Sequence, residues 1–184
     1  MKRLLLSAVI AIALVGTIEA QTKFWVGGSF SISSSDHDPN KDHSFILMPE
    51  FGYRINDNWA VGGMLGFRSF TTETGVFEQK TNSTSIVPFA RYYVGGVSMV
   101  RFFAQGSLPM IFYGGDASYN SVGLIASPGL EIAINEKWGF NMLMPPVLSL
   151  VNTDGNTDFY IGLNDGYNIE DYILKTSISF IYKF

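Results

Sequence analysis

Six charged residues recur at positions that alternate with apolar ones, and they carry most of the chemistry that this sequence suggests. They are Glu50, Arg68, Arg91, Arg101, Glu131 and Lys175. If the alternation is that of β-strands, their side chains share the interior of the fold. Buried charges must be paired, so we predict an ionic network that fills this interior. Four of the six are cations, and this surplus leaves a second interpretation open, in which the interior is a narrow path for anions.

The histidines and the acidic residues offer weaker chemistry. His37 and His43 are the only histidines, and no third ligand at a metal-binding spacing accompanies them. The segment 36–42 resembles the start of a calcium loop, but Lys41 occupies the glycine position and Leu47 the final glutamate position. We therefore predict no catalytic, cofactor-binding or metal-binding residues, and we interpret the acidic residues as solvated loop side chains.

Amphipathic β-strands are the elements that would position these side chains. In residues 171–184 the even positions are mostly aromatic or aliphatic, and the odd positions are mostly polar. Eight such strands are predicted, at 23–33, 43–55, 59–70, 83–94, 98–108, 121–134, 138–150 and 171–184. Short turns and long loops alternate between them. This pattern predicts an all-β fold, an eight-stranded antiparallel up-and-down transmembrane β-barrel.

The N-terminus and the composition fit a protein exported from the cytoplasm. Two basic residues precede the apolar run 4–15, and Ala20 closes the segment, so residues 1–20 are predicted to be a cleaved signal peptide. Residues 21–184 would then form one barrel domain. The chain has no cysteine, so something other than disulfides must hold it together, and a closed hydrogen-bonded barrel is one way. Its net charge of −4 argues against binding to nucleic acid.

Aromatic residues gather where the predicted strands meet the short turns. They include Tyr53, Trp59, Tyr92 and Trp138. A girdle of this kind marks a membrane interface, and the apolar faces of the strands then turn outward to lipid. In a soluble barrel the apolar faces would turn inward, and aromatic residues would have no reason to collect at one end.

Prolines mark an internal repeat of about 40 residues. Similar stretches begin at Pro49, Pro88 and Pro128, and each is typical of a hairpin. Proline lacks the N–H group that a strand ladder requires. We therefore leave the strand register open at Pro88 and at Pro145–Pro146.

The signal peptide, the eight strands, the repeated hairpins and the aromatic C-terminus together resemble the small outer-membrane β-barrel proteins of Gram-negative bacteria. The resemblance is to the OmpA/OmpX-like eight-stranded family, particularly its Bacteroidetes-type members with an outer membrane protein β-barrel domain. Ser177, Ser179, Tyr182 and Phe184 occupy the places of that family's C-terminal assembly signal, with Ser179 where the family has glycine. The resemblance implies a location in the cell outer membrane and insertion by the barrel-assembly machinery.

We expect a structural or surface-interaction role: a monomeric barrel, not an enzyme, that contacts outer-membrane lipid, has a filled lumen and presents acidic loops to an unidentified extracellular ligand. The aromatic and aliphatic residues Phe159, Tyr160, Ile161 and Tyr167 of 151–170 are a candidate recognition surface. The second hypothesis is a narrow channel or porin for small solutes, anions among them. The third is a lipid-modifying enzyme that uses His37 with 33–35, because some eight-stranded barrels modify lipid A.

Overall fold

The computed structural model describes residues 23–37, 40–74, 77–115, 119–162 and 176–184, most of which lie in β-strands. The strands are β1 (Phe24–His37), β2 (Asn40–Arg54), β3 (Trp59–Thr74), β4 (Phe77–Val97), β5 (Val100–Ser107), β6 (Met110–Gly115), β7 (Tyr119–Ala133), β8 (Trp138–Leu143), β9 (Leu148–Thr153), β10 (Asn156–Ile161) and β11 (Ser177–Lys183). Among these residues, no helix is long and apolar enough to cross a bilayer.

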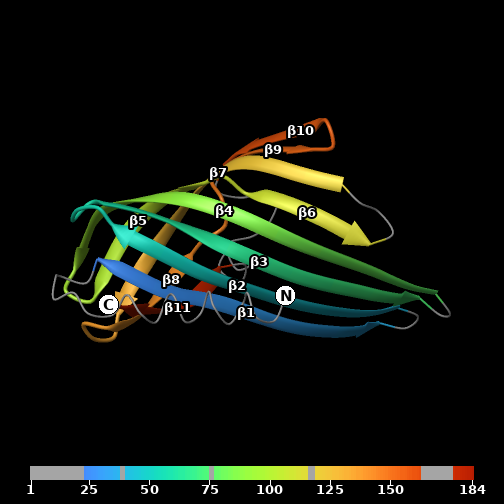
Figure 1. Ribbon diagram of the computed structural model, residues 1–184, viewed down its shortest axis with the longest axis horizontal. Coiled ribbons are helices and arrows are strands. Elements are labelled where there is room, and N and C mark those ends of the chain that lie inside the picture. The colour runs from blue at the N-terminus through green and yellow to red at the C-terminus, as the bar shows by residue number, and fades with distance from the viewer. Residues whose placement is uncertain (1–22, 38–39, 75–76, 116–118, 163–175) are drawn as a thin grey trace, which may run out of the picture.

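Eight of the strands close into a barrel. Their order around the wall is β1, β2, β3, β4, β5, β7, β8 and β11, and β11 pairs with β1 to complete the ring. Each neighbouring pair is antiparallel. The predicted eight-stranded antiparallel barrel is therefore confirmed. Figure 1 shows β1 to β4 reaching farther than β6 and β7 at one end of the molecule.

Several strands are longer than the sequence pattern predicted. β6 lies in the predicted loop 109–120, and the β9–β10 hairpin extends into the predicted loop 151–170. β3 and β4 also continue beyond their expected outer ends and pair as far as Thr74 and Phe77. The outer segments are rich in Ser, Thr and Asn, which are loop-like residues in a sequence, and ladder pairing with neighbours overrides that preference.

Two wall strands are interrupted at prolines. β5 and β6 form one strand that is broken at 108–109, because Pro109 has no N–H to donate. The register to β4 is unchanged across this break, since Phe89 pairs with Ser107 and Ile86 pairs with Met110.

The break between β8 and β9 does change the register. Gly129 pairs with Leu143, whereas Ala126 pairs with Leu148, so this strand advances five residues while β7 advances three. The two additional residues form a bulge around Pro145–Pro146. The sequence had marked this position correctly as one where the alternation is interrupted.

Pro88, by contrast, leaves the wall undisturbed. It pairs with Gly63, and the register between β3 and β4 is constant on both sides of it. The irregularity of β4 lies instead between Tyr93 and Gly95, where the register to β5 shifts. Gly95 has φ of 143°, a conformation that favours glycine.

Apolar side chains cover the outer face, and the inner face holds the polar side chains together with a few buried apolar ones. On β3, Leu65 and Phe67 are exposed, whereas Ala60, on the alternate face, is fully buried. On β11, Phe180 is 45% exposed and its neighbour Ser179 is buried. This arrangement is the inverse of a soluble barrel and suits a wall surrounded by lipid.

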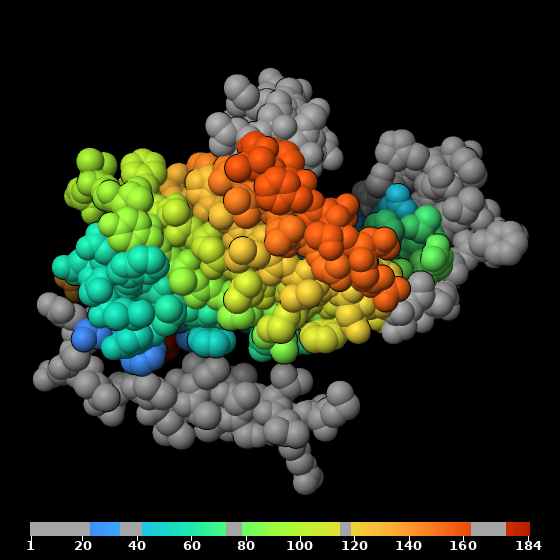
Figure 2. Space-filling view, turned by 90° about the horizontal axis from the view of Figure 1, so that it is seen from above, coloured from blue at the N-terminus to red at the C-terminus, as the bar shows by residue number. Residues whose placement is uncertain are grey.

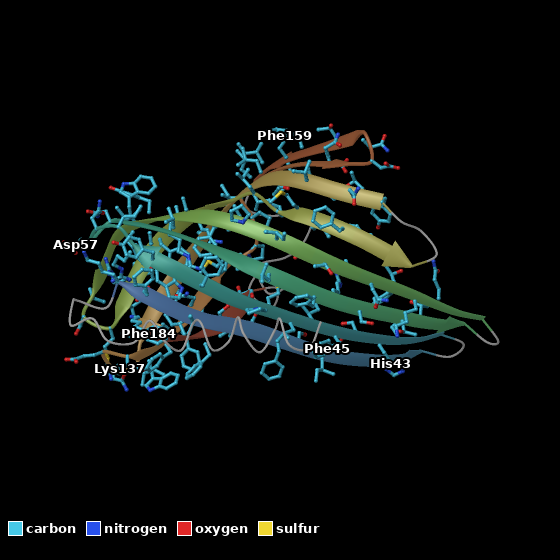
Figure 3. The ribbon with its side chains drawn as sticks, viewed as in Figure 1. His43, Phe45, Asp57, Lys137, Phe159 and Phe184 are labelled. Atoms are coloured by element: carbon cyan, nitrogen blue, oxygen red, sulfur yellow. The ribbon has the colours of Figure 1, made fainter. Side chains whose placement is uncertain are left out.

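The apolar outer belt continues onto β10. Leu124 of β7, Leu150 of β9 and Phe159 of β10 pair in one lateral row, and Phe159 is 65% exposed. Figure 2 shows the β9–β10 hairpin in orange as part of one face of the molecule, and Figure 3 shows Phe159 on its outer side. Phe159 and Ile161 therefore extend the belt, and their role as a recognition surface stays a prediction. Tyr167 lies outside the described residues.

Large aromatic side chains of the inner face lie over glycines on the neighbouring strand. The register places three rings directly opposite a glycine, in the pairs Trp25–Gly52, Phe89–Gly62 and Phe103–Gly129. A Cβ atom built at any of these three glycines would overlap the ring that it faces. The rings can therefore lie against the wall and fill the lumen, and each fitted pair favours a single register.

We predict that Gly52→Ala destabilises the barrel by about 1–3 kcal/mol, because the added methyl group displaces the Trp25 ring. Urea unfolding of the protein in detergent micelles would measure the change. Gly106→Ala is the matched control, since a Cβ atom there meets nothing within 4 Å. Equal effects of the two substitutions would show that strand propensity, and not the fit of the ring, sets the cost.

Candidate functional site

A buried carboxylate, Glu50 on β2, organises the first of two polar clusters in the lumen. Its Oε1 atom accepts hydrogen bonds from Trp25 Nε1 at 2.9 Å, Arg91 Nη2 at 2.8 Å and Asn141 Nδ2 at 3.1 Å. These donors come from β1, β4 and β8, so the bonds tie together separate parts of the ring. Glu50 is only 4% exposed, and the ion pair with Arg91 at 2.8 Å compensates its buried charge.

Arg91 is enclosed almost completely and is 1% exposed. Its Nε atom donates to Gln105 Oε1 at 2.5 Å, and Gln105 in turn donates to Ser107. Its guanidinium carbon also lies over the rings of Trp25, Phe89 and Phe103, at 5.5, 4.5 and 4.7 Å from their centroids. Aromatic faces attract a cation and exclude water from it, which strengthens the ion pair with Glu50.

The second cluster surrounds Glu131 on β7. This carboxylate accepts hydrogen bonds from Lys183 Nζ at 2.6 Å, Tyr93 Oη at 2.8 Å and Arg54 Nη2 at 3.2 Å. Arg54 lies on β2, which is four strands from β7 in either direction around the eight-stranded ring. The Arg54–Glu131 ion pair therefore spans the full width of the lumen.

Tyr93 connects the second cluster to the short-turn end of the barrel. The guanidinium groups of Arg54 and Arg101 lie 4.9 and 4.5 Å from the centroid of its ring. Arg101 also donates to the backbone carbonyl of Asp57 at 2.5 Å, and Asn58 exchanges hydrogen bonds with the backbone of Tyr93. The β2–β3 turn is thereby fastened to β4 and β5.

The two clusters contain three of the six charged residues that the sequence singled out. Glu50 and Arg91 are paired, and Glu131 is the centre of the other cluster. Arg101 lies beside that cluster but contacts a ring and a carbonyl rather than a carboxylate. Arg68 lies nearer the opposite end and makes no ion pair or hydrogen bond in the described part of the chain. Lys175 lies outside the described residues.

Arg54 and Lys183 complete the second cluster, although they were not among the predicted lumen residues. Arg54 has the same strand parity as Glu50, and Lys183 the same parity as Ser179, so alternation placed both on the inner face. What alternation alone could not reveal is that both cations bind the carboxylate of Glu131, which lies diametrically opposite the strand of Arg54.

The predicted interfacial aromatic residues pack in pairs beside the short turns. Trp59 contacts Tyr92 at 5.0 Å between ring centroids, Tyr53 contacts Phe24 at 4.6 Å, and Trp138 contacts Tyr182 at 4.5 Å. Figure 3 places Asp57, Lys137 and Phe184 at this end of the barrel and His43 toward the other.

The two tryptophans occupy equivalent places because their turns are built alike. Asn56 Oδ1 accepts the backbone N–H groups of Asn58 and Trp59. Asn135 Oδ1 accepts those of Lys137 and Trp138 in the same way. The copies of the internal repeat that begin at Pro49 and Pro128 therefore share an asparagine turn, which the copy at Pro88 lacks.

Of the predicted C-terminal assembly signal, Ser177 and Ser179 share the inner-face parity of β11, and Tyr182 and Phe184 share the outer-face parity. Ser179 is buried opposite Asn141, and Ser177 is exposed. Tyr182 and Phe184 form an edge-to-face pair at 5.0 Å, and the backbone N–H of Phe184 donates to the carbonyl of Phe24. The backbone bond to Phe24 fastens the end of β11 to β1. The role of the four residues as an assembly signal stays a prediction.

With a closed lipid-facing barrel and a charged lumen established, the class of protein is an outer-membrane β-barrel. The family model described as "Outer membrane protein beta-barrel domain" matches residues 4–144. The chain belongs to this family, and the resemblance inferred from the sequence is confirmed. No curated protein matches the chain. Among the described residues, no group of three His, Asp or Glu side chains is arranged to hold a metal ion.

We predict that Glu50→Gln destabilises the barrel by about 3–5 kcal/mol, because it leaves Arg91 buried without its counter-charge. The double variant Glu50→Leu/Arg91→Met should recover a large part of this loss, since it removes both charges and retains side-chain volume. Urea unfolding in micelles would measure both variants, with Arg68→Met as the control for removal of an unpaired arginine. A double variant no more stable than Glu50→Gln would contradict this account.

Proposed function

We propose that this protein is a non-catalytic outer-membrane barrel whose filled lumen acts as a rigid anchor for the segments beyond its outer end. The observation that carries the proposal is the burial of Arg91, which is 1% exposed inside a lumen crossed by ion pairs. In this proposal residues 1–20 are a signal peptide removed on export, and 21–184 form the monomeric mature barrel. The short turns face the periplasm and the extended strands face the outside.

A filled lumen follows from the size of the ring and from the residues inside it. Eight strands leave an interior only wide enough for side chains. Here Phe89, Phe103 and Tyr93 occupy that interior together with the two ionic clusters, and all three are at most 5% exposed. A hydrated ion would have to displace these rings and separate Glu131 from Arg54, which supports a structural role over transport.

The extended strands support a role at the cell surface. On β3 the last apolar outward residue is Phe67, and the strand continues to Thr74, about 20 Å farther at 3.3 Å per residue. A wall needed only for crossing the bilayer would end near Phe67. The additional length, together with the exposed Asp158 on β10, fits a polar platform that meets extracellular partners.

A narrow anion path is the second candidate, and the charge of the lumen favours it. Four cations, Arg54, Arg91, Arg101 and Lys183, lie in or beside the two clusters, against Glu50 and Glu131. Within the described residues, the buried Arg54 Nε and Arg91 Nη1 atoms have no hydrogen-bond partner. These donors would attract an anion that entered the lumen.

We predict that planar bilayers containing the purified barrel show no discrete conductance steps at physiological salt, because the lumen is filled. Migration of unheated and heated samples in gels would confirm that the reconstituted protein is folded. Anion-selective steps whose selectivity falls in Arg54→Gln would instead establish the second candidate and overturn the anchor proposal.

We predict that Asn156→Cys, at the tip of the exposed β9–β10 hairpin, reacts with a large polyethylene-glycol maleimide on intact cells. Lys137→Cys, in the β7–β8 turn, should react only after the outer membrane is permeabilised. The chain has no native cysteine, so each label reports a single position. Labelling of Lys137→Cys alone on intact cells would reverse the proposed orientation.

A further inference from the structure

Toward the outer end of the barrel, the inner face of the wall carries mostly hydroxyl-bearing side chains instead of ionic clusters. The strand registers place six inward-facing residues in one lateral row that crosses β1, β2, β3, β4, β6 and β7. In order they are Ser31, Ile46, Arg68, Ser83, Tyr113 and Tyr119. Arg68 is the only charged residue in this row, and most of its neighbours in the row are hydroxyl-bearing.

Arg68 faces inward and is nevertheless exposed. It shares strand parity with Ala60 and Met64, which pack in the lumen, and it alternates with the outward-facing Phe67. Ser31 on the far side of the row is exposed as well. Since these inward-facing side chains contact solvent, the inner face is open at this level, unlike the closed level of Arg91.

The charge of Arg68 has no counter-charge in the described part of the protein. The other arginines of the inner face are each bound to a carboxylate or a carbonyl, as described above. On its own strand and on both adjacent strands, the nearest inward neighbours of Arg68 are uncharged: Gly66, Phe70, Ser44, Ile46, Met48, Thr81, Ser83 and Ser85. A guanidinium group among hydroxyl groups suits an oxyanion, because its planar fork of donors matches carboxylate and phosphate.

Tyr113 and Tyr119 give the same row a second recognition element. Their rings stack at 4.2 Å between centroids, with an interplanar angle of 18°. Tyr113 lies one strand beyond Ser83, which pairs directly with Arg68. The row thus presents a cation, a hydroxyl group and an aromatic pair in succession along the wall.

We propose that Arg68 anchors a binding site for a small anion with a carboxylate or phosphate group, and that this anion enters from the outer end of the barrel. Ser83, the direct neighbour of Arg68 on β4, supplies a hydroxyl donor beside the guanidinium. The site is level with Phe67, the last apolar outward residue of β3, so an outer-leaflet lipid phosphate and a dissolved anion can both reach this height. It lies outward of the filled level, so it does not depend on whether the inner half conducts.

The test is a titration of the full barrel with inorganic phosphate, in nanodiscs of phosphatidylcholine at physiological salt. The NMR signal of the Arg68 Nε–H group should shift and saturate. Affinity in the variants is read from the backbone amide signals of position 68 and of its neighbour Ser83. Arg68→Gln should lower phosphate affinity about tenfold or more, as expected for one lost charge-assisted hydrogen bond, and Arg68→Lys should recover part of it. Lys80→Gln, which removes an exposed outward-facing cation on β4, should leave the affinity unchanged.

Nanodiscs that contain phosphatidylglycerol distinguish the two sources of the anion. An Arg68 shift that appears in these discs without added phosphate would support a lipid phosphate as the occupant. A shift that requires added phosphate would support a dissolved anion. The proposal is overturned if neither condition moves the Arg68 signal, or if Lys80→Gln weakens phosphate binding as much as Arg68→Gln does. Heat-modifiable migration in gels would establish that each variant is folded.

Discussion

The rest of this structure depends on the need to neutralise charge inside a ring that excludes water. An outward apolar belt forces every polar group of the inner face into a narrow lumen, where an unpaired charge is costly. Glu50 and Glu131 meet this need by accepting donors from strands that are distant around the wall. The same bonds that satisfy the charges therefore brace the barrel across its width.

Aromatic rings and glycines make this bracing possible. Trp25 can donate to Glu50 only because its ring lies over Gly52, and Phe103 can cover Arg91 because its ring lies over Gly129. A side chain on either glycine would move the ring away from the wall and into the ionic cluster. Small residues in the wall and large residues in the lumen thus form one packing unit, and the abundance of glycine in the strands has a steric cause.

Strand alternation was enough to predict the fold, the outward belt and the inward placement of Glu50, Arg91 and Glu131. It also gave the correct parity for Arg54 and Lys183. It could not predict partners, because a pair such as Arg54 and Glu131 depends on ring closure and shear, and neither is encoded in local periodicity. It failed for β10, where Asn, Asp and Gly residues at a tight turn hid a hairpin whose Phe159 continues the lipid-facing belt.

The pairing of Lys183 with Glu131 also constrains the order of folding. β11 joins β8 to β1, and the cluster around Glu131 lacks Lys183, one of its two paired cations, until that strand has docked. Before this step the nascent sheet would present an under-neutralised carboxylate and two unpaired edges toward the bilayer, a species with a high free energy in lipid. β1 and β11 lie at opposite ends of the sequence, and contacts between such distant segments form late and slowly. We therefore expect the pairing of β11 with β1 and the loss of water from the lumen to be a single cooperative event near the end of insertion.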